Sequence, residues 1–348
     1  MNNNNQYQKY TIMYLVGGIG FSLALLFYDY DINNFLSIPS LMMVIAPIIV
    51  VKMALYLVPT TQTIYDKIIS CFYKEIILTS GLSGCFMGWV LMGKGAANDG
   101  VLNQISNLWG GYAAAFITVV YSLSFALLYI GAFNQESNIE PDKNCFEIVE
   151  ERKRINYRFI ISIFIYLSIL IGVIYYALWF EGSPGSFGGF LPDVASISLI
   201  LVVFILTVLR TNHVGYIKTF KIIFYDQYGD YDIKQISLSI KTAKELIINI
   251  SILLLCASFV EMISLNFDEL FNAIGNLSAG LLNLLLIYQF LIVQDAFVLQ
   301  NAILKDKFYQ YSWRDSSPSL YVLIAIFLGI LSFILLLNLI RMKNGNWC

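Results

Sequence analysis

The sequence is poor in charge and histidine, and its few cysteines form no CxxC pair. Charged residues make up 13% of the 348 positions, whereas soluble domains carry about 25%. The single histidine, His213, has no partner for a proton relay in the loop around it. No nucleotide-binding loop, catalytic triad or metal cluster is visible, so we expect neither an enzyme nor a cofactor. Without paired spacing we expect no metal site and no disulfide framework among Cys71, Cys85, Cys145, Cys256 and Cys348.

Apolar residues, at 58%, dominate the chain instead. A helix needs about 20 apolar residues to cross the hydrocarbon core of a bilayer. Nine stretches approach that length, of which the sixth is the shortest. We therefore predict an all-α polytopic membrane protein with about nine transmembrane helices at Thr11–Tyr28, Pro39–Leu57, Ile76–Met92, Tyr112–Ala132, Arg158–Trp179, Val194–Leu209, Leu246–Ser264, Ser278–Gln300 and Ser319–Ile340.

The positive charges predict the orientation, because Lys and Arg near span ends stay on the cytoplasmic side. With the N-terminus inside, every one of the 21 Lys and Arg residues falls in an inner segment except Lys94, Arg341 and Lys343. The start of the chain is polar and no cleavage site follows the first apolar run, so we expect a retained first helix. The expected location is a bacterial inner membrane, with the C-terminus outside and no nucleic-acid partner.

Eight of the nine stretches fall into two blocks of four with the same layout. In each block a short outer loop leads into the second helix, and a longer inner segment leads into a hairpin whose second helix carries Tyr121 or Tyr288. An even number of helices per block makes the repeats parallel. The predicted domains are a polar tail (1–10), a first repeat (11–133), a charged cytoplasmic linker (134–157), a second, degenerate repeat (158–300), and a cytoplasmic loop with the ninth helix (301–348).

Two stretches of the first repeat carry the residues that suggest a family. One is Phe35–Val44, around Pro39, at the start of the second helix. The other begins with the Gly-rich third helix Gly81–Met92, passes a polar turn and continues into Gly110–Ser124, which holds small residues, Thr118 and an aromatic. Their order and spacing resemble the MotA/TolQ/ExbB proton-channel family, the ring-forming subunits of motors driven by the proton-motive force.

The resemblance implies a proton-channel or stator-like subunit that couples the proton-motive force to a partner complex. In that family the ion-carrying carboxylate usually belongs to a single-span partner, so we expect an oligomer with a one-span membrane protein bearing an intramembrane Asp. The expected ion path is lined by Thr118, Tyr121, Cys85, Ser83 and Ser122. Gly81, Gly84 and Gly88 would pack the helices closely. Cys85 and Val119 stand where the family usually has Thr, which makes the path less polar.

Other interpretations stay open beside this one. The Gly stripe and the hydroxyls could serve packing alone, which would make the chain a non-conducting scaffold or assembly protein. A small-solute transporter is disfavoured because clearly broken helices are missing. Glu261 is either a proton-binding or partner-docking carboxylate or a group that reaches the outer interface. Asp295 is expected to snorkel or to pair with inner-face lysines rather than to relay protons.

Two further segments complete the prediction. Ile233–Glu245, with Lys234, Lys241 and Lys244, indicates an amphipathic helix that could contact a cytosolic partner. The ninth span contains no carboxylate, so we expect a scaffold helix there rather than a fused partner.

Overall fold

The computed structural model describes five segments of the chain. They are the helices α2 (Ile38–Tyr56), α3 (Gln62–Asp99), α8 (Ile233–Ser264) and α9 (Phe267–Leu304), with the shorter helix Ala115–Phe125. Isolated positions between 161 and 209 are also described. Every one of these residues is helical, so the prediction of an all-α chain is confirmed for the described part.

Several predicted elements lie outside the described residues. These are the polar tail, the linker, the ninth span and the span at Thr11–Tyr28, together with the spans at Arg158–Trp179 and Val194–Leu209 apart from single positions. His213 also lies outside the described residues. Within α8 the side chain of Glu261 is not described, nor is that of Lys52 within α2.

The described helices are longer than the spans predicted inside them. The helix α3 has 38 residues and includes the third span together with part of the preceding inner segment. The predicted amphipathic segment Ile233–Glu245 is continuous with the seventh span in α8, since no Pro or Gly interrupts the 32 residues. The helix α9 begins at Phe267, so the predicted polar turn Leu265–Leu277 is mostly helical.

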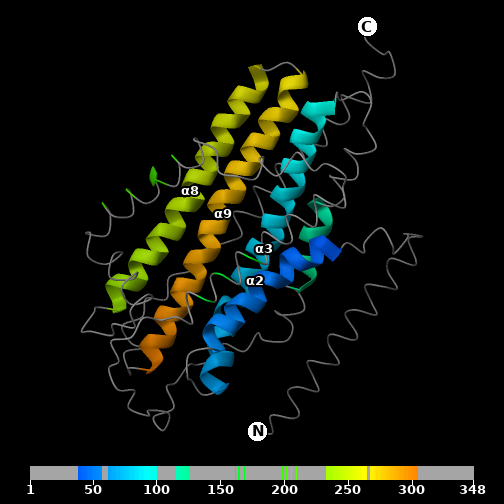
Figure 1. The fold of residues 1–348 in the computed structure, drawn as a ribbon. Helices are drawn as coiled ribbons and strands as arrows, with labels where there is room; N and C mark the ends of the chain where they lie inside the picture. The colour runs from blue at the N-terminus through cyan, green and yellow to red at the C-terminus, as the bar shows by residue number, and fades with distance from the viewer. Residues whose placement is uncertain are drawn as a thin grey trace.

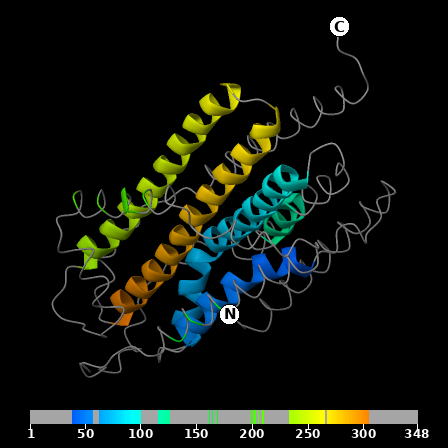
Figure 2. The ribbon, with the colours of Figure 1, turned by 45° about the horizontal axis from the view of Figure 1, so that its top comes forward.

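The helix α9 lies between α3 and α8 and packs against both, while α2 packs mainly against α3 (Figure 1). The helices α8 and α9 run in opposite directions, and Figure 2 shows the same neighbours from a second direction. Only two residues separate the end of α8 from the start of α9, which makes them an antiparallel hairpin. The core of this bundle is apolar, with Phe86, Trp89 and Ile247 fully buried.

Polar and apolar side chains are distributed unusually in the described part. Large apolar side chains are exposed on the outside, among them Leu253 at 69% and Phe164 at 69%. Ionisable groups are buried instead, including Lys244 and Asp295, at 1% each. Among the described residues one stretch, Ala273–Gln300 in α9, is long and apolar enough to cross a membrane, by length and composition.

Candidate functional site

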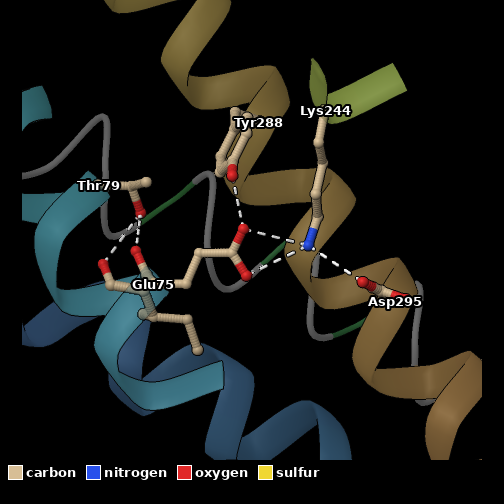
Figure 3. A network of polar contacts seen from close by, with 6 residues as sticks. Glu75, Thr79, Lys244, Tyr288 and Asp295 are labelled. Carbon is tan, nitrogen blue, oxygen red and sulfur yellow. Dashed lines mark hydrogen bonds and ion pairs between the residues drawn. The ribbon is translucent and has the colours of Figure 1, made fainter. Parts of the chain in front are cut away.

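Three ionisable side chains from three helices meet inside the bundle (Figure 3). Lys244 of α8 donates to both carboxylate oxygens of Glu75 on α3, with Nζ 3.2 Å from Oε1 and 3.2 Å from Oε2. The same Nζ lies 3.1 Å from Oδ2 of Asp295 on α9. We call these three residues, with Tyr288, the charge cluster. It joins one helix of the first predicted repeat to two helices of the second.

Tyr288 also contacts Glu75. Its hydroxyl donates a 2.6 Å hydrogen bond to Oε1, so this one oxygen accepts from both a phenol and an ammonium. The Lys244 ammonium also lies 5.5 Å from the ring centre of Phe72 and 5.8 Å from that of Tyr288. A cation at such distances is attracted to the ring electrons when it is in line with the ring face. Aromatic rings thus take the place of water around the ammonium.

Helical spacing explains why α9 supplies two members of the charge cluster. Tyr288 and Asp295 are seven residues apart, which is close to two helical turns, so they share one face of α9. On α3 the hydroxyl of Thr79 donates to the backbone oxygen of Glu75 at 2.8 Å, one turn away. That bond satisfies the hydroxyl locally and leaves the Glu75 carboxylate for Lys244 and Tyr288.

The charge cluster contains one basic and two acidic side chains. Burial by itself lowers the pKa of Lys244, but the neighbouring charges of Glu75 and Asp295 outweigh it and leave that pKa above its ordinary value. Lys244 precedes the predicted seventh span, which begins at Leu246, and it stays a cation at neutral pH. With both carboxylates ionised, one positive charge faces two negative charges.

A neutral polar contact lies further along the same two helices. Gln289 of α9 donates from Nε2 to Ser83 Oγ of α3 at 3.2 Å, and Ser83 donates in turn to the Thr79 carbonyl at 2.9 Å. On α9 the side chain of Gln294 is fully buried next to Asp295, and neither its oxygen nor its nitrogen has a hydrogen-bond partner among the described residues. A buried amide that lacks a partner is costly. The buried side chains of Gln294 and Asp295 make this level of α9 unusually polar.

The predicted Gly stripe forms a close contact with the helix Ala115–Phe125. A Cβ added to Gly84 would lie 2.6 Å from Cγ2 of Thr118, and one added to Gly88 would lie 2.8 Å from Cβ of Ala115. A Cβ on Gly81 would overlap Ser122. Because even a methyl group does not fit, no water fits at these three points of the contact.

The predicted path residues lie in different places. Thr118 is buried, and its hydroxyl donates to the Ala115 carbonyl of its own helix at 2.7 Å. Such a bond within one helix agrees with the interpretation that the hydroxyls serve packing. Ser122 is buried against Gly81, Cys85 is buried within α3, and Tyr121 is half-buried. The side chain of Ser83 contacts α9, through Gln289.

Sequence reasoning misses the charge cluster. In the sequence Glu75 only marks the border of an inner segment, and Lys244 belongs to a helix face open to a cytosolic partner. The structure buries Lys244 instead, and Lys234 is exposed. Asp295 pairs with an inner-face lysine, one of the two outcomes expected for it. One feature of the sequence does point to the charge cluster. Glu75, Lys244 and Asp295 all lie near the inner end of a predicted span, and therefore at a similar depth in the membrane.

No protein-family model, curated protein or solved structure matches the chain. Within the described residues no group of three or more His, Cys, Asp or Glu side chains could hold a metal ion.

Proposed function

We propose that this chain is a polytopic inner-membrane subunit of the proton-channel or stator type, which couples the proton-motive force to a partner complex. The charge cluster is the observation that carries the proposal. Ionisable groups buried among membrane helices are costly and mark ion or proton pathways. Glu75 and Asp295 give this chain carboxylates of its own, in addition to the Asp expected from a single-span partner.

The outer surface supports the membrane part of the proposal. Leu253 on α8, Leu123 on the helix Ala115–Phe125 and Met42 on α2 are large apolar side chains exposed on different helices. In water such a surface would drive association, whereas lipid tails solvate it. Hydroxyls of Ser80 and Ser251 donate to carbonyls one turn earlier, which satisfies them without water.

The contact between α3 and the helix Ala115–Phe125 favours a second candidate, a non-conducting scaffold. At Gly81, Gly84 and Gly88 the helices touch too closely for water, and Thr118 uses its hydroxyl within its own helix. A scaffold requires such packing and needs no proton site. The buried charges have no role in that alternative beyond joining the helices.

The test is proton flux through the purified assembly. The chain is purified in mild detergent, co-purifying chains are identified by mass spectrometry, and the assembly is reconstituted into liposomes that contain a pH-sensitive dye. We expect a one-span protein with an intramembrane Asp, and proton flux under an imposed membrane potential. Glu75→Gln should abolish the flux, while Thr118→Val, which removes a hydroxyl bonded within its own helix, should preserve it. A chain that purifies alone and gives no flux supports the scaffold.

A further inference from the structure

We propose that a line of carboxamide side chains on α9 binds a file of water molecules, which leads from the predicted outer surface to the depth of the charge cluster. The carboxamide line consists of Asn276, Asn283 and Gln294. This inference rests on the proposed function and specifies the entry route of its protons. The ligand of the site is water, and a proton passes along it from one bound water molecule to the next.

The spacing of the three residues places them on one face of α9. Asn276 and Asn283 are seven residues apart, which is close to two helical turns, and Asn283 and Gln294 are 11 residues apart, which is close to three turns. At a rise of about 1.5 Å per residue, the helix advances about 27 Å between Asn276 and Gln294. The hydrocarbon core of a bilayer is about 30 Å thick, so the carboxamide line covers most of that depth.

Burial increases along the carboxamide line from its predicted outer end. Asn276 is exposed, Asn283 is 8% exposed and Gln294 is fully buried. Between the two buried amides, Ile287 and Phe290 lie on the same face of α9 and are half-buried. The line therefore begins at an exposed amide, and close packing does not seal the face that connects Asn283 to Gln294.

The two buried amides carry hydrogen-bonding groups that no described residue uses. Nδ2 of Asn283, and both Nε2 and Oε1 of Gln294, have no hydrogen-bond partner in the described part of the chain. A buried polar atom without a partner is costly, and ordered water is the usual partner where the protein supplies none. An amide both donates and accepts, so Gln294 can bind one water molecule through its nitrogen and another through its oxygen.

Gln289 shows that a buried amide on α9 can find a partner within the protein. Its side chain is 5% exposed and donates from Nε2 to Ser83 Oγ of α3 at 3.2 Å. Gln294 lies five residues later and therefore on a different face of α9. The two glutamines share their chemistry and nearly share their burial, but only the Gln289 amide nitrogen is bonded to α3. Gln289 is thus the matched control for Gln294.

The inner end of the carboxamide line coincides with the charge cluster. Gln294 directly precedes Asp295, whose Oδ2 lies 3.1 Å from Lys244 Nζ. No charged residue occurs in α9 between Asn276 and Asp295. Amides do not take up or release protons at neutral pH, so the line conducts through its water molecules alone. Asp295 is therefore the first charged side chain of α9 that a proton on this route meets.

Silver labelling of introduced cysteines tests whether water follows the carboxamide line. The full chain in liposomes, with its five native cysteines replaced, carries one cysteine at Asn283→Cys or Gln294→Cys. Ag⁺ reacts with a thiol that water reaches, and a maleimide added after denaturation labels the thiols that stayed free, which mass spectrometry detects. We expect both cysteines to react with Ag⁺, while Leu284→Cys and Leu291→Cys, which are buried at similar depths, should stay protected. Protection of either Asn283→Cys or Gln294→Cys would overturn the inference.

Substitution by leucine tests the amide of Gln294. Gln294→Leu removes polar atoms that have no partner among the described residues, so Tm in detergent should be unchanged or higher. Gln289→Leu breaks the bond to Ser83 and should lower Tm. Proton flux should be lost in Gln294→Leu and persist in folded Gln289→Leu. A Tm loss in Gln294→Leu as large as that in Gln289→Leu would make Gln294 a packing residue and defeat the inference.

The two measurements separate this inference from the proposed function. Silver labelling of Asn283→Cys and Gln294→Cys without proton flux in the wild type would defeat the proposed function alone, because water would enter a protein that does not conduct. Wild-type flux that is unchanged in Gln294→Leu would defeat the inference alone, because the protons would take another route.

Discussion

Tyr288 and Glu75, 213 positions apart in the sequence, are joined by a hydrogen bond of 2.6 Å in which the phenol donates to Oε1. Both side chains lie inside the bundle, one on α9 and one on α3. The bond connects the predicted repeats at the same oxygen that accepts from Lys244. A neutral and an ionic contact therefore act on one carboxylate.

Tyr288→Phe should destabilise the protein while preserving the packing of the ring. A hydrogen bond to a charged group contributes about 1.5–3 kcal/mol, and we expect a loss in that range. The measurement is unfolding in detergent, followed by helical circular dichroism. In the Glu75→Gln background the same substitution should cost less, because the acceptor is no longer charged. Equal costs in both backgrounds would show that the phenol does not act through the carboxylate.

Lys244→Met should destabilise the protein far more than the small change in side-chain size suggests. It leaves Glu75 and Asp295 buried without their cation, and breaking a buried pair costs about 3–5 kcal/mol. Lys234→Met is the matched control on the exposed face of α8, where we expect a change below about 0.5 kcal/mol. Neutralising both carboxylates as well, with Glu75→Gln and Asp295→Asn, should restore much of the stability. A mild effect of Lys244→Met alone would contradict the charge cluster.

The sequence predicts the helical class well and the charge cluster poorly, for a physical reason. Helix formation in α8 and α9 follows from local composition, since their long apolar runs carry no Pro and few Gly. The depth of Glu75, Lys244 and Asp295 also follows from their place near the ends of the apolar runs. Which helix lies beside which does not follow, because lipid solvates apolar faces equally and the partner of each helix is set by a few long-range contacts.

The helix contact at the Gly stripe, unlike the charge cluster, can be predicted from the sequence. Gly81, Gly84 and Gly88 repeat at helical spacing, so a close helix contact can be predicted locally. The partner side chains Thr118 and Ser122 also stand out in the sequence, but their role depends on hydroxyl direction. In Thr118 that direction is toward the Ala115 carbonyl, which no sequence pattern specifies.

Gly84→Ala should loosen the contact between α3 and the helix Ala115–Phe125. The new methyl would lie 2.6 Å from Cγ2 of Thr118, and overpacking of this kind costs about 1–3 kcal/mol. Adding Thr118→Ala removes Cγ2 and the hydroxyl, so the double variant should recover part of the loss. Unfolding of the single and double variants in the same detergent measures both effects. A Gly84→Ala protein as stable as the wild type would show that the two helices separate without cost.

The exposed face of α8 should contact lipid at Cys256 and water at Lys234. Cys256 is exposed, and Leu253, one turn earlier on the same face, is 69% exposed. A spin label on Cys256, with the other cysteines replaced, should collide often with oxygen, which concentrates in the bilayer, and rarely with a water-soluble nickel chelate. A label on Lys234→Cys in a Cys256→Ser background should show the reverse preference, because positive side chains remain at the interface. Equal access of the chelate to both labels would place this part of α8 in water and contradict an integral membrane protein.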